Sequence, residues 1–365
     1  MIVPRLSAAL VLIYLASSVS AAEPSASKYN DVVGRGVAFL NQAQAEDGSF
    51  SKQSGPGITA LVATALLRNG RTLDDPAVSK ALAYLEGHVQ PDGGIHAKDS
   101  LYKNYETCLA IMCFSEANQD GRYQAIIDSA KKFVTDIQWD KSEGHDESSL
   151  SYGGAGYGNH RRPDLSNTSY LIDALKASGA GPEDPAMQRA LQFVSRCQNL
   201  ESEYNTTEFA AKVDDGGFYY TVAAGGSSQA GEAPGGGLRS YGSMTYAGLK
   251  SMIYAGVGPD DPRVKAAYDW IRKNYSLEQN PGMGDAGLYY YYHTFAKALA
   301  ALETQELTDS QGQTHDWRQE LVDQLAETQL DNGSWINTNA RWLEADPNLV
   351  TGYALLALSY CRPTP

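Results

Sequence analysis

Residues 329–335 read Gln-Leu-Asp-Asn-Gly-Ser-Trp, and this phrase belongs to a pattern that recurs along the whole chain. Residues 44–50 repeat it as Gln-Ala-Glu-Asp-Gly-Ser-Phe. Shorter glycine phrases, most of them with an aspartate, lie around residues 93, 153, 216 and 284. Counted between the glycines at 48, 93, 153, 216, 284 and 333, the intervals are 45, 60, 63, 68 and 49 residues. Such spacing predicts six structural repeats with insertions of different length.

Two kinds of helical segment alternate between these phrases. The first kind begins with Asp-Pro at residues 75–76, 184–185 and 261–262, where aspartate suits a helix N-cap and proline the first helical position. Apolar residues then follow at i, i+3, i+4 and i+7, which predicts one buried stripe. The second kind is apolar on most sides and is expected inside the fold. It covers residues 58–67, 105–114, 170–175, 244–255, 294–302 and 350–358.

These alternating segments predict the fold class. Each helix pair can bury its apolar face only against neighbouring pairs, and a closed ring of inner helices within outer helices satisfies all six. We therefore predict an all-α (α/α)6 toroid of six helical hairpins, formed as a single domain by residues 23–365. The glycine-rich stretch at 223–237 has no apolar periodicity and predicts an insertion, either a lid or a solvated loop.

The N-terminus and the composition indicate where the protein works. Residues 1–22 carry Arg5, an apolar run at 8–16 and small residues at 19–22, which is typical of a cleaved secretory signal. The run is too short to span a membrane comfortably, and we expect no integral membrane segment after cleavage. The predicted location is therefore secreted or periplasmic. Lys plus Arg total 29 against 43 Asp plus Glu, and the net charge of −14 disfavours nucleic acid as a partner.

Four cysteines are too few for a disulfide scaffold in 365 residues. They could form disulfide bridges or stay as buried thiols, and the sequence does not decide between the two. It does not indicate the oligomeric state either. The residues concerned are Cys108, Cys113, Cys197 and Cys361.

The two complete phrases carry a family resemblance. Residues 329–335 match the QxxxGxW repeat of squalene and hopene cyclases, and residues 44–50 match it with Phe50 in place of tryptophan. Over about residues 28–362 the chain resembles the α/α toroids of the terpenoid cyclase and protein prenyltransferase superfamily. The resemblance implies that Gln44, Gln329 and Trp335, with Phe50, tie neighbouring repeats together.

The resemblance also identifies where the family's chemistry would lie. Residues 153–168 resemble the stretch with the Asp-x-Asp-Asp-Thr motif of cyclases, whose middle aspartate protonates the substrate. Asp164 and Thr168 match this motif, but Ser166 occupies the position of the acid, and a hydroxyl cannot protonate an alkene. Tyr292-His293-Thr294 matches the prenyltransferase phrase that holds the zinc-binding histidine, but no Asp or Cys stands near residues 241–243. We therefore expect neither activity, no metal and no cofactor.

Tyrosines beside the repeat turns form the candidate ligand site. Side chains with an apolar face and a hydroxyl suit an amphiphilic lipid, a terpenoid or a glycan, and we predict such a ligand in a central cavity. The alternative is that the tyrosines only fill the ring axis. The candidate ligand-binding residues are Tyr157, Tyr220, Tyr241, Tyr290 and Tyr292.

Whether the protein is an enzyme stays open at this point. The candidate catalytic residues are His293, Asp164 and Asp285, although a lone histidine is more often structural and the aspartates also suit helix caps. A secreted polysaccharide lyase or hydrolase would use His293 with tyrosine or aspartate partners. An interaction scaffold is the third hypothesis.

Overall fold

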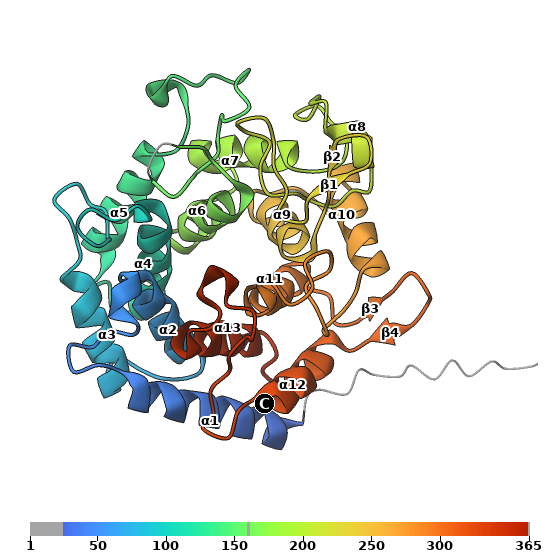
Figure 1. Cartoon of the computed structure of the whole chain (residues 1–365). Helices are drawn as coiled ribbons and strands as arrows, with labels where there is room; N and C mark the ends of the chain where they lie inside the picture. Colours follow the sequence, from blue (N-terminus) through green and yellow to red (C-terminus); the bar gives the residue numbers. More distant parts are fainter. Residues whose placement is uncertain (1–24, 159–160, 364–365) are drawn as a thin grey trace, which may run out of the picture.

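Two concentric rings of helices make up the protein (Figure 1). The computed structural model describes residues 25–158 and 161–363, so the predicted signal at 1–22 lies outside the described residues. The inner ring consists of α2 (Gly57–Arg68), α4 (Lys103–Ala117), α6 (Leu165–Ala177), α9 (Gly242–Tyr254), α11 (Leu288–Ala301) and α13 (Pro347–Ser359). The outer ring consists of α1 (Ala26–Ala43), α3 (Pro76–Glu86), α5 (Gln124–Asp136), α7 (Pro185–Arg196), α10 (Pro262–Lys273) and α12 (Trp317–Thr328).

The inner ring is closed. Each inner helix contacts the next, from α2 through α4, α6, α9 and α11 to α13, and α13 contacts α2. Helix α1 lies against α12 and α13, so the first and last parts of the described chain are neighbours (Figure 1). The all-α toroid prediction is confirmed. The apolar segments predicted as inner helices extend further in the structure, by up to five or six residues at the N-terminal ends of α6 and α11.

The outer helices show why the Asp-Pro phrases begin them. Asp184 and Asp261 are N-caps whose carboxylates accept the backbone N–H of Ala186 and Arg263. Asp75 is also an N-cap, but its carboxylate accepts Thr72 N instead (2.9 Å). In α5, which has no Asp-Pro start, the buried stripe consists of Ile127, Ala130, Phe133 and Val134.

Glutamines tie neighbouring repeats together, as the family resemblance implies. Gln44 Nε2 donates to Gly48 O (3.0 Å) within its own turn and to Ala77 O (2.8 Å) on the following outer helix. Gln329 Nε2 donates to Gly333 O (2.9 Å) and to Val32 O (3.0 Å) of α1, so it joins the last repeat to the first. Gln138 and Gln198, which the sequence analysis missed, make the same pair of bonds in the third and fourth repeats.

The repeat glycines allow the turns to approach the outer helices closely. Gly153 has φ 81°, and a Cβ there would lie 1.8 Å from Arg189 O of α7. Gly333 has φ 86°, and its Cβ would lie 2.4 Å from Arg35 O of α1. A side chain at either position would therefore meet both backbone strain and a steric clash.

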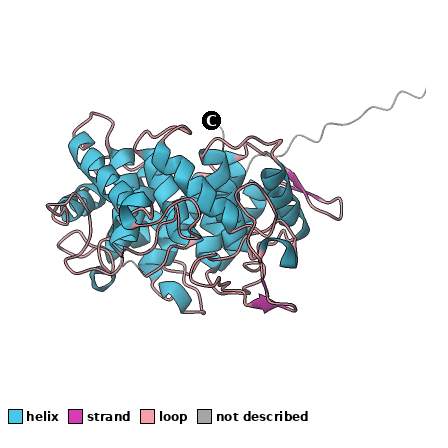
Figure 2. Cartoon of the chain, turned by 90° about the horizontal axis from the view of Figure 1, so that it is seen from above, coloured by secondary structure: helices cyan, strands magenta, loops and turns pink. Residues whose placement is uncertain are grey.

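The remaining elements are short. They are α8 (Ala210–Val213), the 3₁₀ turns η1 (Lys52–Ser54), η2 (Lys141–Glu143) and η3 (Arg341–Leu343), and the antiparallel pairs β1 (Glu232–Ala233) with β2 (Gly237–Leu238) and β3 (Leu307–Thr308) with β4 (Thr314–His315). Both strand pairs lie at the periphery of the ring (Figure 2). All four cysteines are buried free thiols. Among the described residues, no helix is long and apolar enough to cross a membrane.

Candidate functional site

A cavity of about 590 Å³ lies at the end of the ring where the inner helices begin. First-turn residues of several inner helices line it, among them Ile58 of α2, Ser166 of α6 and Met244 of α9. Aromatic side chains dominate the lining, with one tryptophan and eight tyrosines. The tyrosines are Tyr102, Tyr105, Tyr157, Tyr170, Tyr220, Tyr241, Tyr290 and Tyr353.

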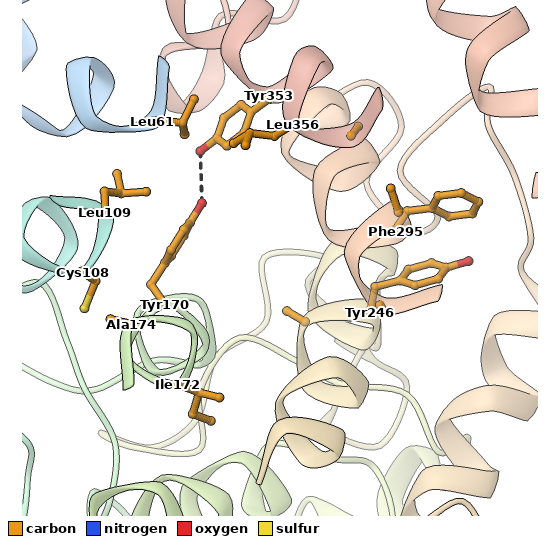
Figure 3. Packing of buried hydrophobic residues seen from close by; sticks show 14 of the residues in the cluster. Leu61, Cys108, Leu109, Tyr170, Ile172, Ala174, Tyr246, Phe295, Tyr353 and Leu356 are labelled. Carbon is orange, nitrogen blue, oxygen red and sulfur yellow. Dashed lines mark hydrogen bonds between the residues drawn. The ribbon is translucent and has the colours of Figure 1, made fainter. Parts of the chain in front are cut away.

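Three tyrosine hydroxyls meet deep in this cavity. Tyr353 OH of α13 lies 3.0 Å from Tyr105 OH of α4 and 3.5 Å from Tyr170 OH of α6. The rings of Tyr105 and Tyr170 pack edge to face, with centroids 4.8 Å apart. Figure 3 shows Tyr170 and Tyr353 pointing toward each other across the centre of the ring. Helices from opposite sides thus converge on one polar contact within an aromatic wall.

Ser166 takes part in this wall. Its Oγ lies 3.2 Å from Tyr290 OH of α11, and both residues line the cavity. The position that carries the acid in the cyclase motif therefore presents a hydroxyl to the interior. The other matching residues serve the turn, because Thr168 Oγ1 accepts Ala155 N and donates to Asp164 O.

Exposed apolar residues surround the entrance to the cavity. Leu101 and Tyr102 on one segment, and Trp342 and Leu343 on another, line the cavity yet are 44–57% exposed; we call these four residues the mouth. Trp342 and Leu343 have φ of 56° and 66°, a left-handed conformation that is strained for bulky side chains. Backbone strain is therefore stored where two apolar side chains are held out at the entrance.

The insertion at 223–237 reaches the same entrance. Gln229 lines the cavity, and its Oε1 accepts a hydrogen bond from Arg341 Nη2, beside Trp342. The sequence left a lid and a solvated loop open for this stretch, and the structure places one of its side chains in the cavity wall.

Two buried glutamates also line the cavity, and the sequence analysis missed both. Glu344 caps α11 from a distant loop, because its carboxylate accepts Tyr290 N (2.8 Å) and Tyr289 N (3.3 Å). It also accepts Asn337 Nδ2 (2.7 Å). Burial raises the pKa of Glu344, although these hydrogen bonds oppose the rise. A carboxylate at a helix N-terminus is stabilised by the helix dipole.

Glu106 of α4 is the second buried glutamate, with 3% of its surface exposed. Its oxygens accept Ala97 N (2.9 Å) and Ser100 Oγ (2.9 Å), so the carboxylate holds the segment that leads to the mouth. Burial raises its pKa, and the two hydrogen bonds oppose this rise. A Cβ on Gly55 (φ 81°) would overlap Glu106 Oε1, which explains why only glycine fits at that position.

Four of the five candidate ligand-binding tyrosines lie in the cavity wall: Tyr157, Tyr220, Tyr241 and Tyr290. Tyr292 lies outside the lining, and its hydroxyl donates to Leu277 O (2.6 Å). The helix turns its side chain away from that of Tyr290, since residues two apart lie on different faces.

The candidate catalytic residues lie behind or away from the cavity wall. His293 is buried with its ring stacked at 5.9 Å on Tyr353. Burial and the nearby Lys297 hold its pKa well below the usual range, so the imidazole is neutral. Asp285 is exposed in a turn, and its backbone carbonyl accepts Asn337 Nδ2 (2.7 Å). Neither residue is part of the lining.

Asp164 lies just behind the wall as the N-cap of α6. Its carboxylate accepts Asn167 N (2.9 Å) and Asn167 Nδ2, and it interacts with the hydroxyl of Tyr220, which does line the cavity. Burial raises the pKa of Asp164 to about 6. The guanidinium of Arg162 lies 5.1 Å from the Tyr220 ring centroid. Asp164 and His293 therefore both lie behind the wall, Asp164 against Tyr220 and His293 against Tyr353, whereas Asp285 lies in an exposed turn.

A charged cluster closes the interior one to two helical turns further along the same helices. Asp173 of α6 binds Lys250 Nζ of α9 (2.6 Å) and Lys297 Nζ of α11 (2.7 Å). Lys250 Nζ also donates to Ser169 Oγ (2.7 Å). All three charged side chains are at most 7% exposed. We call Asp173, Lys250 and Lys297 the charged cluster; it satisfies its own charges rather than facing the cavity.

Metal-binding geometry is absent from the part of the chain that the structure describes, where no three His, Cys, Asp or Glu side chains come together. A further hollow of about 650 Å³ is a shallow surface groove between residues 43–53 and Asn348. Most of the residues along it are polar or charged, and it contains the exposed ion pair of Lys52 with Asp47 (2.6 Å).

Comparison with known proteins identifies the scaffold. The family profile of the squalene-hopene cyclase C-terminal domain matches residues 52–223. A type II terpene cyclase from Scytonema superposes with a TM-score of 0.52 at 14% identity, covering 92% of this chain and 98% of that structure. The profile covers less than half of the chain, so these likenesses show a terpenoid cyclase-like toroid fold.

Enzymes with other named activities share this fold. A D-mannose isomerase superposes with a TM-score of 0.55 at 12% identity, covering 92% of this chain and 97% of the isomerase. A glycosidase superposes with a TM-score of 0.51 at 12% identity, covering 91% and 96%. No curated protein matches the sequence. At these identities the likeness shows the fold alone, so function must be argued from the site.

Proposed function

We propose that this terpenoid cyclase-like toroid binds a small amphiphilic molecule, of the lipid, terpenoid or glycan type, in its tyrosine-lined cavity. The observation that carries the proposal is a cavity of about 590 Å³ whose wall contains eight tyrosines. This volume lies within the range of pockets that enclose drug-sized molecules. Tyrosine faces offer apolar contact and their hydroxyls offer hydrogen bonds, which is the combination that an amphiphile needs.

The mouth supports entry of an apolar ligand. Leu101, Tyr102, Trp342 and Leu343 stay exposed around the entrance, although burying them elsewhere would stabilise the fold. Exposed apolar side chains gathered at a cavity entrance are typical of binding sites. Protonation of an alkene is not part of the proposal, because Ser166 presents a hydroxyl where the cyclase acid would lie.

Ligand binding is testable by native mass spectrometry and calorimetry of the mature protein. We expect one molecule of a C15 isoprenoid alcohol or of octyl glucoside, kept below its micelle concentration, to bind per chain. Ser166→Trp places an indole in the cavity and is expected to weaken binding at least tenfold. Ser79→Trp on the exposed face of α3 is the matched control and leaves binding unchanged. Equal binding by both variants, or none by the wild type, contradicts the proposal.

Export from the cytoplasm is the second part of the proposal. It rests on the sequence of residues 1–22, which resembles a cleaved signal. The intact mass of protein recovered from the periplasm or the medium should correspond to a chain that begins near Glu23. Protein that stays in the cytoplasm with residues 1–22 attached would contradict it.

A second candidate function is an enzyme of another class on this scaffold, such as a lyase or hydrolase. The observation that favours it is Asp164, a buried acid with a pKa raised to about 6 that interacts with the cavity-lining Tyr220. A group that titrates near neutral pH can act in acid–base catalysis. The candidate predicts turnover of a glycan substrate that Asp164→Asn abolishes without loss of binding. Equal turnover by the wild type and the variant would contradict a catalytic role for Asp164.

A further inference from the structure

The charge of the cavity wall, taken with the proposed binding function, narrows the class of ligand. Among the described residues, three acidic side chains line the cavity, Asp99, Glu106 and Glu344, and Lys98 is the one basic residue in its lining. Lys98 and Asp99 are exposed at the edge, where water screens their charges, whereas both glutamates are buried. The buried part of the wall therefore combines carboxylates with the faces of aromatic rings.

Helix N-termini also face this end of the ring, and their partial positive charge would favour an anion unless it is compensated. Carboxylates compensate three of them. Asp164 accepts an N–H at the start of α6, Glu344 accepts two at the start of α11, and Asp346 accepts two at the start of α13. These three acids are occupied with the backbone.

Glu106 is different because it caps no helix in this way and has no cation. It accepts one hydrogen bond on each oxygen, from Ala97 N and Ser100 Oγ. No lysine, arginine or histidine within residues 25–158 and 161–363 forms an ion pair with it, and no charged group contributes to its raised pKa. A buried carboxylate without a positive partner is costly, so either a proton or a cationic ligand must supply the missing charge.

Aromatic rings lie on the same side of α4 as this carboxylate. Tyr102 is the N-cap of α4 and Glu106 lies in the first turn of this helix, and both residues line the cavity. The Tyr157 ring packs edge to face with Tyr102 at 5.2 Å between centroids. Aromatic faces beside a carboxylate are the arrangement that recognises organic ammonium groups.

We propose that the ligand is a cationic amphiphile whose ammonium head lies between Glu106, Tyr102 and Tyr157 while its apolar body fills the cavity beyond them. This inference rests on the proposed function, since it names the ligand class of the same cavity. Glu106 is a binding residue in this account and needs no chemical step.

The test uses three probes of equal chain length, decylammonium, decan-1-ol and decanoate, titrated into the mature protein by calorimetry below their micelle concentrations. We expect decylammonium to bind about tenfold more tightly than decan-1-ol, a difference of about 1.4 kcal/mol, and decanoate to bind most weakly. In Glu106→Gln the amide oxygen can accept Ala97 N and the amide nitrogen can donate to Ser100 Oγ, so both partners are kept with one bond reversed. The variant should reduce decylammonium to the affinity of decan-1-ol, and the affinity for decan-1-ol should itself change less than twofold.

Asp74→Asn is the matched control, because it removes the same charge from an exposed residue outside the cavity lining and should alter each affinity less than twofold. If Glu106→Gln fails to fold, the wild-type order of the three probes still decides the matter. Decan-1-ol binding as tightly as decylammonium overturns the cationic assignment and leaves the binding function standing. Binding of none of the probes overturns both.

Discussion

The two halves of the ring interior use the same inner helices for opposite purposes. At one end, Tyr170 of α6 and Tyr290 of α11 line a cavity that reaches the surface. About one turn further along α6, and two along α11, Asp173 and Lys297 belong to the charged cluster, which is closed. The same helices surround both halves, so the difference lies in which of their side chains line the interior.

The comparison separates structural charges from functional ones. In the charged cluster, one carboxylate is shared by two lysines, and every charge has a partner within 2.7 Å. In the cavity, Glu106 is equally buried but has only neutral donors. Charges that pair with one another inside the protein stabilise one packing, whereas a carboxylate without a charged partner is available to a ligand.

The largest expected effect comes from breaking the charged cluster. Asp173→Asn leaves two buried lysines without their carboxylate and should lower the free energy of unfolding by about 3–5 kcal/mol. Guanidinium denaturation of the mature protein measures this. Glu106→Gln, at similar burial, is the control and should change it by about 1 kcal/mol or less. Similar losses in both variants would remove the distinction between the two halves.

The pH dependence of stability comes next. Burial raises the folded-state pKa of Asp164 to about 6 from 3.8, so the unfolded chain loses its proton first as pH rises. Ionisation of Asp164 therefore lowers the free energy of unfolding by roughly 2–3 kcal/mol as the pH rises from about 4 to 6, and a further rise in pH adds nothing to this loss. Asp164→Asn keeps an N-cap acceptor and should remove this fall.

For Asp173 the change of stability with pH has the opposite sign. Burial acts to raise its pKa, but the two lysines outweigh burial and hold the pKa at about 2, so its contribution is present above about pH 4 and lost as pH falls toward 2. Denaturation midpoints taken from pH 2 to 7 therefore separate the two aspartates. A wild-type curve that rises steadily from pH 4 to 6, with no change in Asp164→Asn, contradicts the burial of that acid.

The tyrosine hydroxyls at the boundary of the two halves give a smaller effect. Tyr353→Phe removes the contacts of its hydroxyl with Tyr105 OH and Tyr170 OH and should cost about 1 kcal/mol. Tyr102→Phe at the exposed mouth is its matched control, and its thermal unfolding midpoint should match the wild type. An unchanged midpoint for Tyr353→Phe would mean that the hydroxyl cluster does not stabilise the boundary.

The smallest effect concerns the strain at the mouth. Leu343→Gly removes the cost of φ 66° for a side chain that is 55% exposed, so stability should stay level or rise by up to about 1 kcal/mol. Binding of the C15 alcohol should weaken, because an apolar part of the mouth is lost. Reduced stability together with unchanged binding would show that Leu343 serves the fold alone.

The fold followed from the sequence because each repeat carries local signals. The Asp-Pro caps, the i, i+3, i+4, i+7 stripes and the glycine turns all depend on neighbouring residues, and together they required a closed ring. The candidate site was harder to predict from the sequence. Tyr170 and Tyr353 lie in segments that are apolar all round, so no sequence pattern indicated that their hydroxyls meet across the axis.

The buried acids show the same limit. Glu344 caps α11, which begins 56 residues earlier in the chain. Glu106 lacks a charged partner because no described helix places a lysine, arginine or histidine beside it. Both facts depend on contacts that no local pattern encodes. Tyr292 was assigned to the ligand site as part of a run of four tyrosines, but a helix turns consecutive side chains to different faces.

The central claim is that the cavity at the start of the inner helices receives the ligand while the charged cluster does not. Hydrogen–deuterium exchange of the mature protein, with and without a C15 isoprenoid alcohol, tests it most directly. We predict that the ligand slows exchange in residues 97–106 and 336–349, around the mouth, and leaves the exchange rates of the outer helices unchanged. Exchange that is unchanged at the mouth, or slowed only elsewhere, would contradict the account.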